Sequence, residues 1–493
     1  MLNDTYDVVV VGAGNAGLCA ALSARESGAH VLLLEKAPKE FRGGNTRFSG
    51  GGFRFTYDSL DDIRPMVPDL TDEEAATLDA GSYTSSDFFD DIMHVTEYCA
   101  DESLSRLLVE ESYPTVRWLT DLGVRWILSV STHAVRVNGK VKFPAGRVIS
   151  VNDAGAGLVA TLFPAAERAG VVIAYGAKAI EMLSDDRGGV SGVTVRTEDG
   201  QQNVRANGVV LAAGGFEANP EMRVKYLGPG WDLVKVRGCR YNTGETLEMA
   251  LREGAQPTGH WSGCHAVMVD AEAPAVEAAY QHRYSYPYGI LVDIDGNRFV
   301  DEGEDNFSYT YAKFGRAILA RPHRVAYQIF DEKVVGLLRP EYNKGSRITA
   351  DSIDSLGKRL VGLDWENLVR TVAAYNAAVS DAPFDPSKKD GKSAAGIVPV
   401  KSNWAQRLDT PPYYGFPVTC GITFTFGGIS IDRNGAVQNT EGSTIPGLFA
   451  AGEITGGSFY HAYPGGSGLM KGAAFGRIAG RNAARTVGSQ RSE

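Results

Sequence analysis

The clearest chemical signal in the sequence lies near its start, in the segment Gly12-Ala13-Gly14-Asn15-Ala16-Gly17. This GxGxxG spacing falls between a β-branched run and a helical pattern. There Gly12 permits a tight turn, Gly14 lets a pyrophosphate approach the backbone and Gly17 allows close helix–strand packing. Glu35 ends the next apolar run, 18 residues after Gly17, where a carboxylate accepts hydrogen bonds from ribose hydroxyls. The spacing predicts a dinucleotide-binding site.

Two further glycine-rich segments extend this site and select the cofactor. Gly43-Gly44-Asn45-Thr46 and Ser49-Gly50-Gly51-Gly52 follow soon after Glu35, and their amides and small hydroxyls suit the pyrophosphate and flavin end of a long cofactor. Near the C-terminus a glycine-rich turn begins another helix. The amides of Gly468 and Leu469 there suit the flavin N1–C2=O region, where negative charge gathers on reduction. Three loops in this order predict FAD rather than NAD.

The elements that must position these loops follow from hydrophobic periodicity. Residues 7–36 read as strand, helix, strand, because two buried apolar runs flank a segment of helical spacing. From about 260 to 420 the chain becomes rich in Tyr, Trp, Pro and His. After 421 the glycine-rich βα pattern resumes and ends in a helix near 467–487. The first and last parts of the chain are therefore predicted to form one domain interrupted by a second.

Two local signals predict smaller elements between the loops. Thr71 and Glu74 have the spacing of a capping box at the start of a helix. Asn138-Gly139 is a two-residue turn signal between two short alternating strands, which predicts a hairpin.

Composition limits the class of protein. The 493 residues include 49 Lys+Arg and 59 Asp+Glu, a net charge of −10, and no basic run that favours a nucleic-acid partner. The five cysteines contain no CxxC pair, which excludes a disulfide framework, a zinc knuckle or a c-type haem and predicts no metal site. The start lacks a signal-peptide pattern, and glycines interrupt the longest apolar stretch. We therefore expect a cytoplasmic protein without a membrane span.

Segments along essentially the whole chain resemble the flavoprotein subunits of succinate dehydrogenase and fumarate reductase, and within that superfamily the FAD-dependent tricarballylate dehydrogenases. These segments are GGNTRFSGG, AAGGFEANPEMR (212–223), YLGPGWD (226–232), RYNTGE (240–245), HWSGCHAV (260–267), GNRFVDEG (296–303), YTYAKFGRAIL (309–319), GITFTFGG (421–428) and YPGGSGL (463–469). The resemblance implies an α/β fold, α+β overall. A Rossmann-type FAD-binding domain of residues 1–259 and 422–493 would carry an inserted α+β capping domain of residues 260–421, which closes over the flavin.

The loops and the resemblance together give the expected FAD contacts. Succinate dehydrogenases tether FAD through a His whose place is taken here by Asn45, so the resemblance implies a non-covalent flavin. The predicted FAD-binding residues are Gly12, Gly14, Asn15, Ala16, Gly17, Glu35, Lys36, Gly44, Asn45, Thr46, Ser49, Gly50, Gly51, Ala179, Ala213, Gly214, Glu245, Glu453, Ser467, Gly468 and Leu469.

The resemblance also implies a reaction. The family adds or removes two hydrogens across a C–C bond beside a carboxylate or carbonyl, as a hydride at flavin N5 and a proton at a side chain. His265 matches one of two His that hold carboxylates in fumarate reductases, the alternative being a structural role. Phe424 takes the place of the second His, Tyr463 that of a clamping Arg, and Asn306–Phe307 that of the proton-transferring Arg. The proton relay of a fumarate reductase is therefore expected to be absent.

The segment Tyr463-Pro464-Gly465 is similar instead to a segment of ketosteroid dehydrogenases, which use Tyr residues as base and as carbonyl-polarising acid. Tyr309 and Tyr311 are further candidates, with packing as their alternative role. The predicted catalytic residues are Tyr463, His265, Tyr309, Tyr311 and His461.

Basic and aromatic residues of the middle segment are candidates for holding the substrate. Arg298 is the exception, since pairing with Asp301 or Glu302 is the simpler role for it. The basic candidates are Arg54, Arg240, Arg283, His282 and His461, and the aromatic run is Tyr284, Tyr286, Tyr288, Phe307 and Tyr309.

The sequence therefore predicts an FAD-dependent dehydrogenase or reductase of the tricarballylate-dehydrogenase type, acting on a small carboxylate or ketone. A cyclic-ketone desaturase of ketosteroid type is the nearest alternative, and a flavin electron carrier or assembly partner is an alternative of another class. No haem or iron–sulfur motif is present in the sequence, so electrons are expected to pass to a redox protein, a quinone or oxygen.

Overall fold

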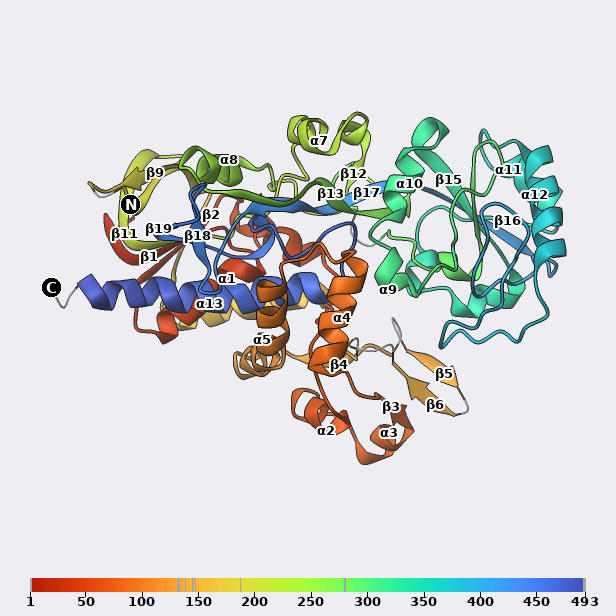
Figure 1. Cartoon of the computed structure of the whole chain (residues 1–493), viewed down its shortest axis with the longest axis horizontal. Coiled ribbons are helices and arrows are strands. Elements are labelled where there is room, and N and C mark those ends of the chain that lie inside the picture. The colour runs from red at the N-terminus through yellow and green to blue at the C-terminus, as the bar shows by residue number, and fades with distance from the viewer. Residues whose placement is uncertain are drawn as a thin grey trace.

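The computed structural model describes residues 2–130, 134–137, 139–143, 146, 148–186, 188–278 and 281–490. Two sheets lie side by side along the long axis, with both chain ends on the same side of the molecule (Figure 1). Within the described residues no helix combines the length and the apolar character that crossing a membrane requires.

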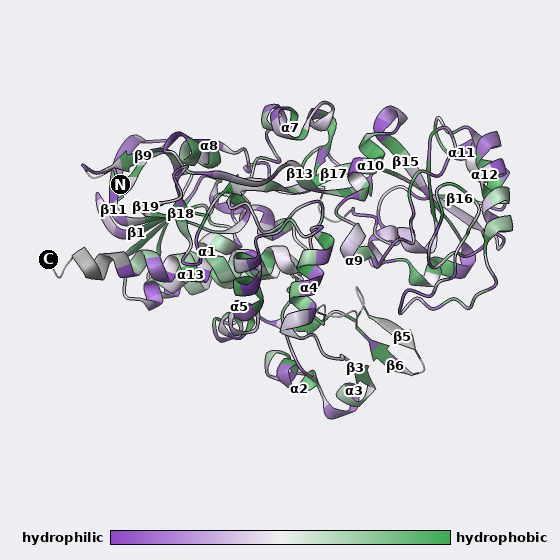
Figure 2. Cartoon of the chain, viewed as in Figure 1, coloured by the Kyte–Doolittle hydropathy of each residue, from purple (hydrophilic) through white to green (hydrophobic). Residues whose placement is uncertain are grey.

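The first sheet has eight strands and contains the strand–helix–strand unit predicted at the start of the chain. β1 pairs in parallel with β2 and with β11, so that Val8 lies between Val31 and Gly208. The strands at its centre are mostly apolar (Figure 2). Its strands are β1 (Thr5–Val11), β2 (Val31–Glu35), β8 (Val172–Tyr175), β9 (Lys178–Ser184), β10 (Val190–Thr197), β11 (Gly200–Leu211), β18 (Ala436–Gln438) and β19 (Thr444–Ala450).

Helices α1 (Asn15–Glu26) and α13 (Ser467–Gln490) pack against each other beside this sheet. Glycines allow the close approach: a Cβ on Gly476 would lie 2.4 Å from the Ala16 oxygen, and one on Gly480 would lie 2.0 Å from the Ala20 oxygen. Because the contacts advance in the same direction along both helices, α1 and α13 run parallel. Their N-termini therefore lie at the same end, which is the end that carries the predicted FAD loops.

Most strands of the second sheet come from the inserted segment. Its longest strands, β13 and β17, pair antiparallel from Pro257 opposite Ile429 to Asp270 opposite Val418. Positions 260 and 421, where the sequence places the domain boundaries, fall inside these two strands rather than in linkers. The strands are β12 (Lys235–Val236), β13 (Pro257–Asp270), β14 (Ile290–Asp293), β15 (Val325–Asp331), β16 (Ile348–Ala350) and β17 (Tyr413–Ile429).

Shorter elements complete the two parts. The predicted capping box is confirmed, because Thr71 and Glu74 bond reciprocally at the start of α3. The predicted hairpin is present as β5 and β6, while Asn138 of its turn lies outside the described residues. These elements are α2 (Leu60–Ile63), α3 (Asp72–Thr77), β3 (Leu78–Asp79), α4 (Ser85–Val95), α5 (Glu102–Asp121), β4 (Trp126–Leu128), β5 (Val135–Val137), β6 (Lys140–Lys142), β7 (Ile149–Val151), α6 (Ala154–Arg168), α7 (Pro220–Leu227), α8 (Glu245–Arg252), α9 (Phe307–Thr310), α10 (Phe314–Leu319), α11 (Ile353–Arg359) and α12 (Trp365–Ala378).

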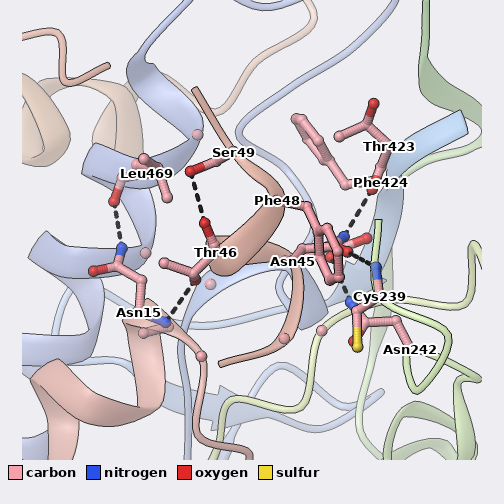
Figure 3. Close-up of a pocket in the computed structure, with 18 of the residues that line it drawn as sticks. Asn15, Asn45, Thr46, Phe48, Ser49, Cys239, Asn242, Thr423, Phe424 and Leu469 are labelled. Carbon is pink, nitrogen blue, oxygen red and sulfur yellow. Dashed lines mark hydrogen bonds between the residues drawn. The ribbon is translucent and has the colours of Figure 1, made fainter. Parts of the chain in front are cut away.

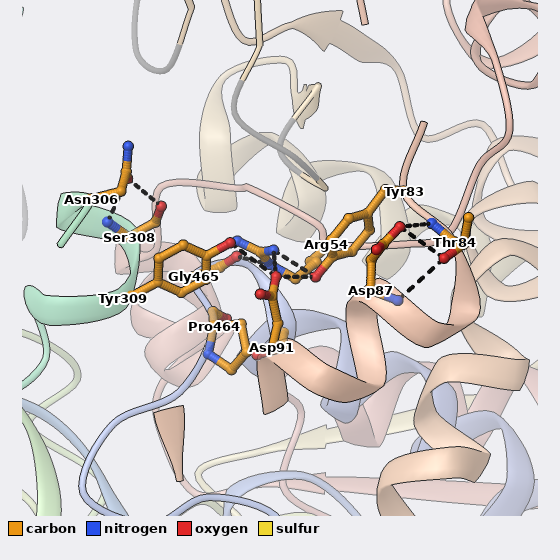
Figure 4. Close-up of polar contacts among 11 residues, drawn as sticks. Arg54, Tyr83, Thr84, Asp87, Asp91, Asn306, Ser308, Tyr309, Pro464 and Gly465 are labelled. Atoms are coloured by element: carbon orange, nitrogen blue, oxygen red, sulfur yellow. Dashed lines mark hydrogen bonds and ion pairs between the residues drawn. The ribbon is translucent and has the colours of Figure 1, made fainter. Parts of the chain in front are cut away.

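A buried polar cluster joins the inserted segment to the first part of the chain (Figure 4). Nη1 of the fully buried Arg54 lies 3.0 Å from Asp91 Oδ2 and donates to the Tyr83 hydroxyl at 2.7 Å. Tyr309, on α9, donates to the same Asp91 oxygen at 2.9 Å. Arg54 Nε donates to the Gly465 oxygen at 2.9 Å, in the loop that carries Tyr463. We call Arg54, Tyr83, Asp91 and Tyr309 the Arg54 cluster.

Replacing Asp91 with Ala is expected to destabilise the protein by about 3 kcal/mol, because the buried Arg54 guanidinium loses its carboxylate. Urea unfolding followed by fluorescence measures the change. Asp90→Ala is the matched control, since Asp90 lies on the same helix and is exposed, and we expect it to change stability by less than about 0.5 kcal/mol. Equal losses in the two variants would contradict a structural role for the cluster.

Candidate active site

One continuous cavity runs from the GxGxxG loop to the inserted segment. At one end it is lined by Gly12, Gly14 and Glu35, and at the other by His265 and Tyr463. We call the first the cofactor end. The second, the reaction end, comprises Arg237, His265, Tyr311, Phe424 and Tyr463.

The three glycine-rich loops are hydrogen-bonded to one another at the cofactor end. The Asn15 main-chain N–H donates to Thr46 Oγ1 at 2.8 Å, and Asn15 Nδ2 donates to the Leu469 oxygen at 2.7 Å (Figure 3). The Ser49 hydroxyl donates in turn to the Thr46 oxygen at 2.8 Å. Asn15 thus lies at the centre of the site and ties together loops from the start, the second glycine segment and the C-terminal turn.

Two carboxylates line the cofactor end beyond these loops. Glu35 is buried and accepts from the main-chain N–H of Ala37 at 2.8 Å and of Ala13 at 3.3 Å. Burial raises the pKa of Glu35, although these N–H donors oppose the rise. The location of Glu35 at the end of β2, beside the GxGxxG turn, suits hydrogen bonding to a ribose.

The second carboxylate, Glu245, lies 2.9 Å from Lys36 Nζ and 2.7 Å from Lys178 Nζ. Burial works against its ionisation, but the hydrogen bonds from Lys178, Thr243 and Lys36 lower the pKa of Glu245 to about 2. Lys178 was not predicted from the sequence, although its neighbour Ala179 was, and both line the cavity.

Nearly all of the predicted FAD-binding residues line the cavity. Gly14 leaves it open, because the atom nearest to a Cβ built there is Thr46 Oγ1 at 3.6 Å. Gly17 instead serves packing, since its Cβ would lie 1.8 Å from the Gly12 oxygen, and the Ser467 hydroxyl donates to Pro464. The predicted residues that line the cavity are Gly12, Gly14, Asn15, Ala16, Glu35, Lys36, Gly44, Asn45, Thr46, Ser49, Gly50, Gly51, Ala179, Ala213, Gly214, Glu245, Glu453, Gly468 and Leu469.

This donor set fits FAD. The parallel N-termini of α1 and α13 direct main-chain N–H groups and positive helix ends toward the cavity, as an anionic cofactor requires. The buried carboxylate of Glu35 offers the ribose an acceptor, and the open glycine positions leave room for the cofactor backbone.

The side chain of Asn45 is fully engaged by the protein. Its Nδ2 donates to Glu217 Oε1 at 2.5 Å. The same Nδ2 donates to the Thr423 oxygen at 2.7 Å, and Oδ1 accepts from the Cys239 N–H at 2.8 Å (Figure 3). Asn45 therefore braces the second glycine segment against β17 and the segment after β12.

A pair of carboxyl groups lies behind Asn45. Burial raises the pKa of Glu217, and the nearby Glu453 raises it further. Burial likewise raises the pKa of Glu453, which accepts from the Thr425 N–H at 2.9 Å. Asn242 Nδ2 donates to Glu217 Oε1 at 2.7 Å. Glu217 was not singled out from the sequence, because only its neighbours in space reveal the pair.

The reaction end holds a chain of three side chains. The Tyr311 hydroxyl donates to the Tyr463 hydroxyl, which lies 3.2 Å from His265 Nδ1. If Tyr463 donates to Nδ1, then Nε2 carries the ring proton, and Nε2 is buried without a hydrogen-bond partner among the described residues. This geometry leaves His265 an N–H to offer to a ligand oxygen.

These three side chains come from different elements. His265 lies on β13 opposite Phe424 on β17, with ring centroids 5.2 Å apart. Tyr311 follows α9, and Tyr463 precedes α13. A Cβ on Gly468 would lie 3.6 Å from Tyr463 Cε2, so the reaction end sits directly on the C-terminal glycine turn.

Burial governs the protonation of this end. Burial lowers the pKa of His265 well below its ordinary value, and the Arg237 guanidinium lowers it further, so the imidazole is neutral near pH 7. Burial raises the pKa of Tyr463 well above its usual range, and Tyr311 adds to the rise while Arg237 opposes it. Tyr463 therefore rests as a neutral phenol beside a cation.

Two predicted catalytic residues are not brought to this end. Tyr309 belongs to the Arg54 cluster, and burial raises its pKa to about 12, which keeps its hydroxyl a donor to Asp91. The side chain of His461 is 43% exposed, and its main-chain N–H donates to His260 Nδ1 at 3.1 Å. Neither residue lines the cavity.

The basic candidates also lie elsewhere, with one exception. Arg240 pairs with Glu277 at 2.9 Å, Arg283 with Asp270 at 2.6 Å, and Arg298 with Glu302 at 2.5 Å, the last in agreement with the sequence. His282 does line the cavity, with Glu341 at 2.7 Å.

Sequence reasoning missed three basic residues that line the cavity. Arg237 and Arg339 line it, as does Lys471, whose pKa burial lowers to about 7. Arg237 comes three residues before the RYNTGE segment that supported the resemblance, but nothing in its spacing marks it. Of the aromatic run, Tyr284 and Phe307 line the cavity, whereas Tyr286, Tyr288 and Tyr309 do not.

Comparisons of the sequence and of the structure with known proteins point to the same family. The FAD binding domain family model matches residues 7–469. The chain is 33% identical to "Fumarate reductase (cytochrome)" of Shewanella frigidimarina, over 98% of this chain and 78% of that protein. A solved flavocytochrome c3 fumarate reductase in the open conformation matches with a TM-score of 0.73 and 28% identity, over 98% of this chain and 79% of that one. A 3-ketosteroid Δ1-dehydrogenase from Sterolibacterium denitrificans has the same fold, with a TM-score of 0.75 and 20% identity, over 98% and 100%.

Acid precipitation of the purified yellow protein is expected to release FAD into the supernatant. Asn45 has no ring nitrogen that forms a flavin bond, and its amide is occupied by Glu217, Thr423 and Cys239. The absorbance of supernatant and pellet measures the outcome. Flavin that stays with the precipitate would contradict non-covalent binding.

Glu35→Ala is expected to weaken FAD binding by about 1.5–3 kcal/mol, through loss of a charged acceptor for the ribose. Fluorescence titration of the apoprotein with FAD measures the dissociation constant, with Glu35→Gln as the variant of equal size. Glu40→Ala is the control, because Glu40 is exposed a few residues away. Identical affinities for Glu35→Ala and Glu40→Ala would remove Glu35 from the site.

Proposed function

The chain belongs to the FAD binding domain family that includes the flavoprotein fumarate reductases, and on that basis we propose how its reaction end works. The protein is an FAD-dependent oxidoreductase that acts on C=C bonds, and we propose that the reacting bond lies next to a carboxylate or carbonyl. The proposal concerns the residues that hold the substrate and move its proton.

The observation that carries the proposal is the chain Tyr311–Tyr463–His265 above the C-terminal glycine turn. A hydroxyl held between a second hydroxyl and an imidazole can exchange a proton with a substrate carbon and recover it from its neighbour. The free Nε2 of His265 lies in the same cavity, where it can polarise a substrate oxygen.

Bound FAD supplies or accepts the hydride at N5. In the direction of reduction, Tyr463 gives its proton to the neighbouring substrate carbon, while Tyr311 stabilises the resulting oxyanion by its hydrogen bond. In the direction of dehydrogenation, Tyr463 first passes its own proton to His265 Nδ1, and the resulting phenolate then accepts the substrate proton. His265 holds the substrate carbonyl or carboxylate oxygen throughout, and Arg237 lowers the cost of charge on Tyr463.

The charge at the reaction end limits how many carboxylates the substrate can carry. In the described lining around the reaction end, the cations Arg237 and Arg339 face the anion Glu341, a net charge of +1 when the buried His265 and His282 are neutral. Tricarballylate carries three carboxylates and would leave two uncompensated. We therefore propose the chemistry of the tricarballylate dehydrogenases with a less charged substrate.

A cyclic ketone is the second candidate. Two tyrosine hydroxyls in contact, Tyr311 and Tyr463, suit a carbonyl-polarising pair, and Phe424 replaces the second fumarate-reductase His with an apolar wall. A pure electron carrier has no use for such a chamber. We propose a redox protein, a quinone or oxygen as the electron acceptor.

Tyr463→Phe and His265→Ala are each expected to lower kcat/KM by roughly 10²–10⁴ while leaving FAD content unchanged. The substrate is the one identified by a stopped-flow screen of unsaturated carboxylates and cyclic ketones for flavin reoxidation or reduction. Tyr460→Phe is the control, because Tyr460 lies in the same loop outside the cavity. Wild-type rates in both active-site variants would mean that the proton chain is misplaced.

Fumarate and succinate are expected to be poor substrates. By the resemblance, Tyr463 and either Asn306 or Phe307 take the places of carboxylate-binding Arg residues of fumarate reductases. Each lost Arg–carboxylate pair costs about 2–5 kcal/mol for a buried, unpaired carboxylate. Steady-state assays with both compounds test this. Turnover at the efficiency of a dedicated fumarate reductase would refute it.

A further inference from the structure

We propose that Arg237 anchors a single carboxylate of the substrate, whose remaining body is aromatic or cyclic. This inference rests on the proposed function and names the substrate class of the same site. It starts from a buried cation at the reaction end for which the described part of the chain supplies no counter-charge.

Arg237 directly follows β12, and 6% of its surface is exposed. Its Nη1 donates to Thr423 Oγ1 at 3.1 Å, and its Nε, also buried, has no hydrogen-bond partner among the residues that the structure describes. Across the described parts of the chain no Asp or Glu oxygen lies within 4.0 Å of its guanidinium nitrogens. The side chain nevertheless lines the cavity, together with His265 and Tyr463.

The other buried arginines show how this protein normally treats such a charge. Arg54, Arg283 and Arg298 each have a carboxylate oxygen within 2.5–3.0 Å. Arg223 donates instead to three main-chain oxygens, those of Glu217, Trp231 and Asp232. Arg237 alone among the five described buried arginines has neither arrangement.

A buried cation without a counter-charge is costly, and a ligand carboxylate removes that cost when it binds. The guanidinium fork presents two N–H groups to two carboxylate oxygens, a match that a neutral carbonyl cannot reproduce. With His265 Nε2 in the same cavity, Arg237 takes the role of the clamping Arg residues whose places, by the resemblance, are taken by Tyr463 and by Asn306 or Phe307.

The other charged residues described around the reaction end leave no positive charge that would bind a second anion. Arg339 Nε lies 3.5 Å from Glu341 Oε2, so the Arg339 charge is compensated within the protein, and the neutral His282 has its Nε2 2.7 Å from Glu341 Oε1. Arg339 also packs over the rings of Phe307, at 5.1 Å, and Tyr284, at 5.8 Å.

Aromatic rings line the cavity between Arg237 and the group formed by Arg339, His282 and Glu341. Tyr284 lies with its ring centroid 5.0 Å from that of Tyr311, and Phe424 lies 5.0 Å from Tyr463. A flat or cyclic apolar body fits such walls, with its carboxylate directed to Arg237 and the reacting C–C bond beside Tyr463.

Matched probes test the anchor without turnover. trans-Cinnamate carries a carboxylate conjugated to a C=C bond and a ring, and trans-cinnamamide has the same shape without the charge. Perturbation of the flavin absorbance of the oxidised holoenzyme gives the dissociation constant of each. We expect the wild type to bind cinnamate at least 10-fold more tightly than cinnamamide.

Arg237→Gln is expected to weaken cinnamate binding by about 30-fold or more and to change cinnamamide binding by less than about 3-fold, with FAD content unchanged. Arg237→Lys should retain part of the preference, since it keeps the charge but loses the fork. Arg240→Gln is the control, because Arg240 is exposed and paired with Glu277.

Three results would overturn the inference. Equal losses for both probes in Arg237→Gln would mean a general effect on the chamber, and loss of FAD with the preference intact would assign Arg237 to the cofactor. A wild type that binds neither probe, or both equally, would reject the substrate class. A carboxylate preference in a protein that turns over no unsaturated carboxylate or ketone would reject the proposed function and leave the anchor standing.

Discussion

The parallel packing of α1 against α13 is the contact on which the site depends. The two helices come from opposite ends of the chain, and glycines at positions 476 and 480 let their backbones touch. Because the helices run in the same direction, both N-termini open onto one cavity, and Asn15 bonds the first loop to the second and to the last. A side chain at either glycine would push the two helices apart, and with them the loops that must surround one cofactor.

The inserted segment is placed over that cofactor site by two further constraints. The paired strands β13 and β17 run from one sheet to the other as a continuous ribbon and carry His265 and Phe424 opposite each other. The Arg54 cluster holds α9 and the loop before α13 together at a second point. Tyr311 and Tyr463 meet across this junction, so the proton chain exists only when both parts are in place.

The reaction end differs from the rest of the interior in one respect: it contains a buried charge that the described residues do not compensate. The other buried arginines of the described chain meet either a carboxylate or, in Arg223, three main-chain oxygens. The buried carboxyl groups of Glu217 and Glu453 accept hydrogen bonds from Asn45, Asn242 and Thr425. The uncompensated charge, that of Arg237, lies beside the reacting groups, where a ligand can compensate it. A strained or unsatisfied group in a cavity is more informative about function than a satisfied one, because stability alone does not explain its retention.

The sequence by itself determined the cofactor loops and the fold class, because GxGxxG, the strand that follows it and Glu35 are local patterns whose geometry depends on a few adjacent residues. It also placed His265, Tyr311 and Tyr463 among the candidates, but it placed Tyr309 there too. Only the tertiary structure separated Tyr309 from Tyr311, since residues two apart on a helical turn point in nearly opposite directions and their partners come from remote segments. The same holds for the arginines: the sequence offered Arg54 and Arg283 as substrate-binding candidates and gave no reason to choose Arg237. Within the described chain, the difference lies in carboxylates that folding brings within reach of Arg54 and Arg283 but not of Arg237.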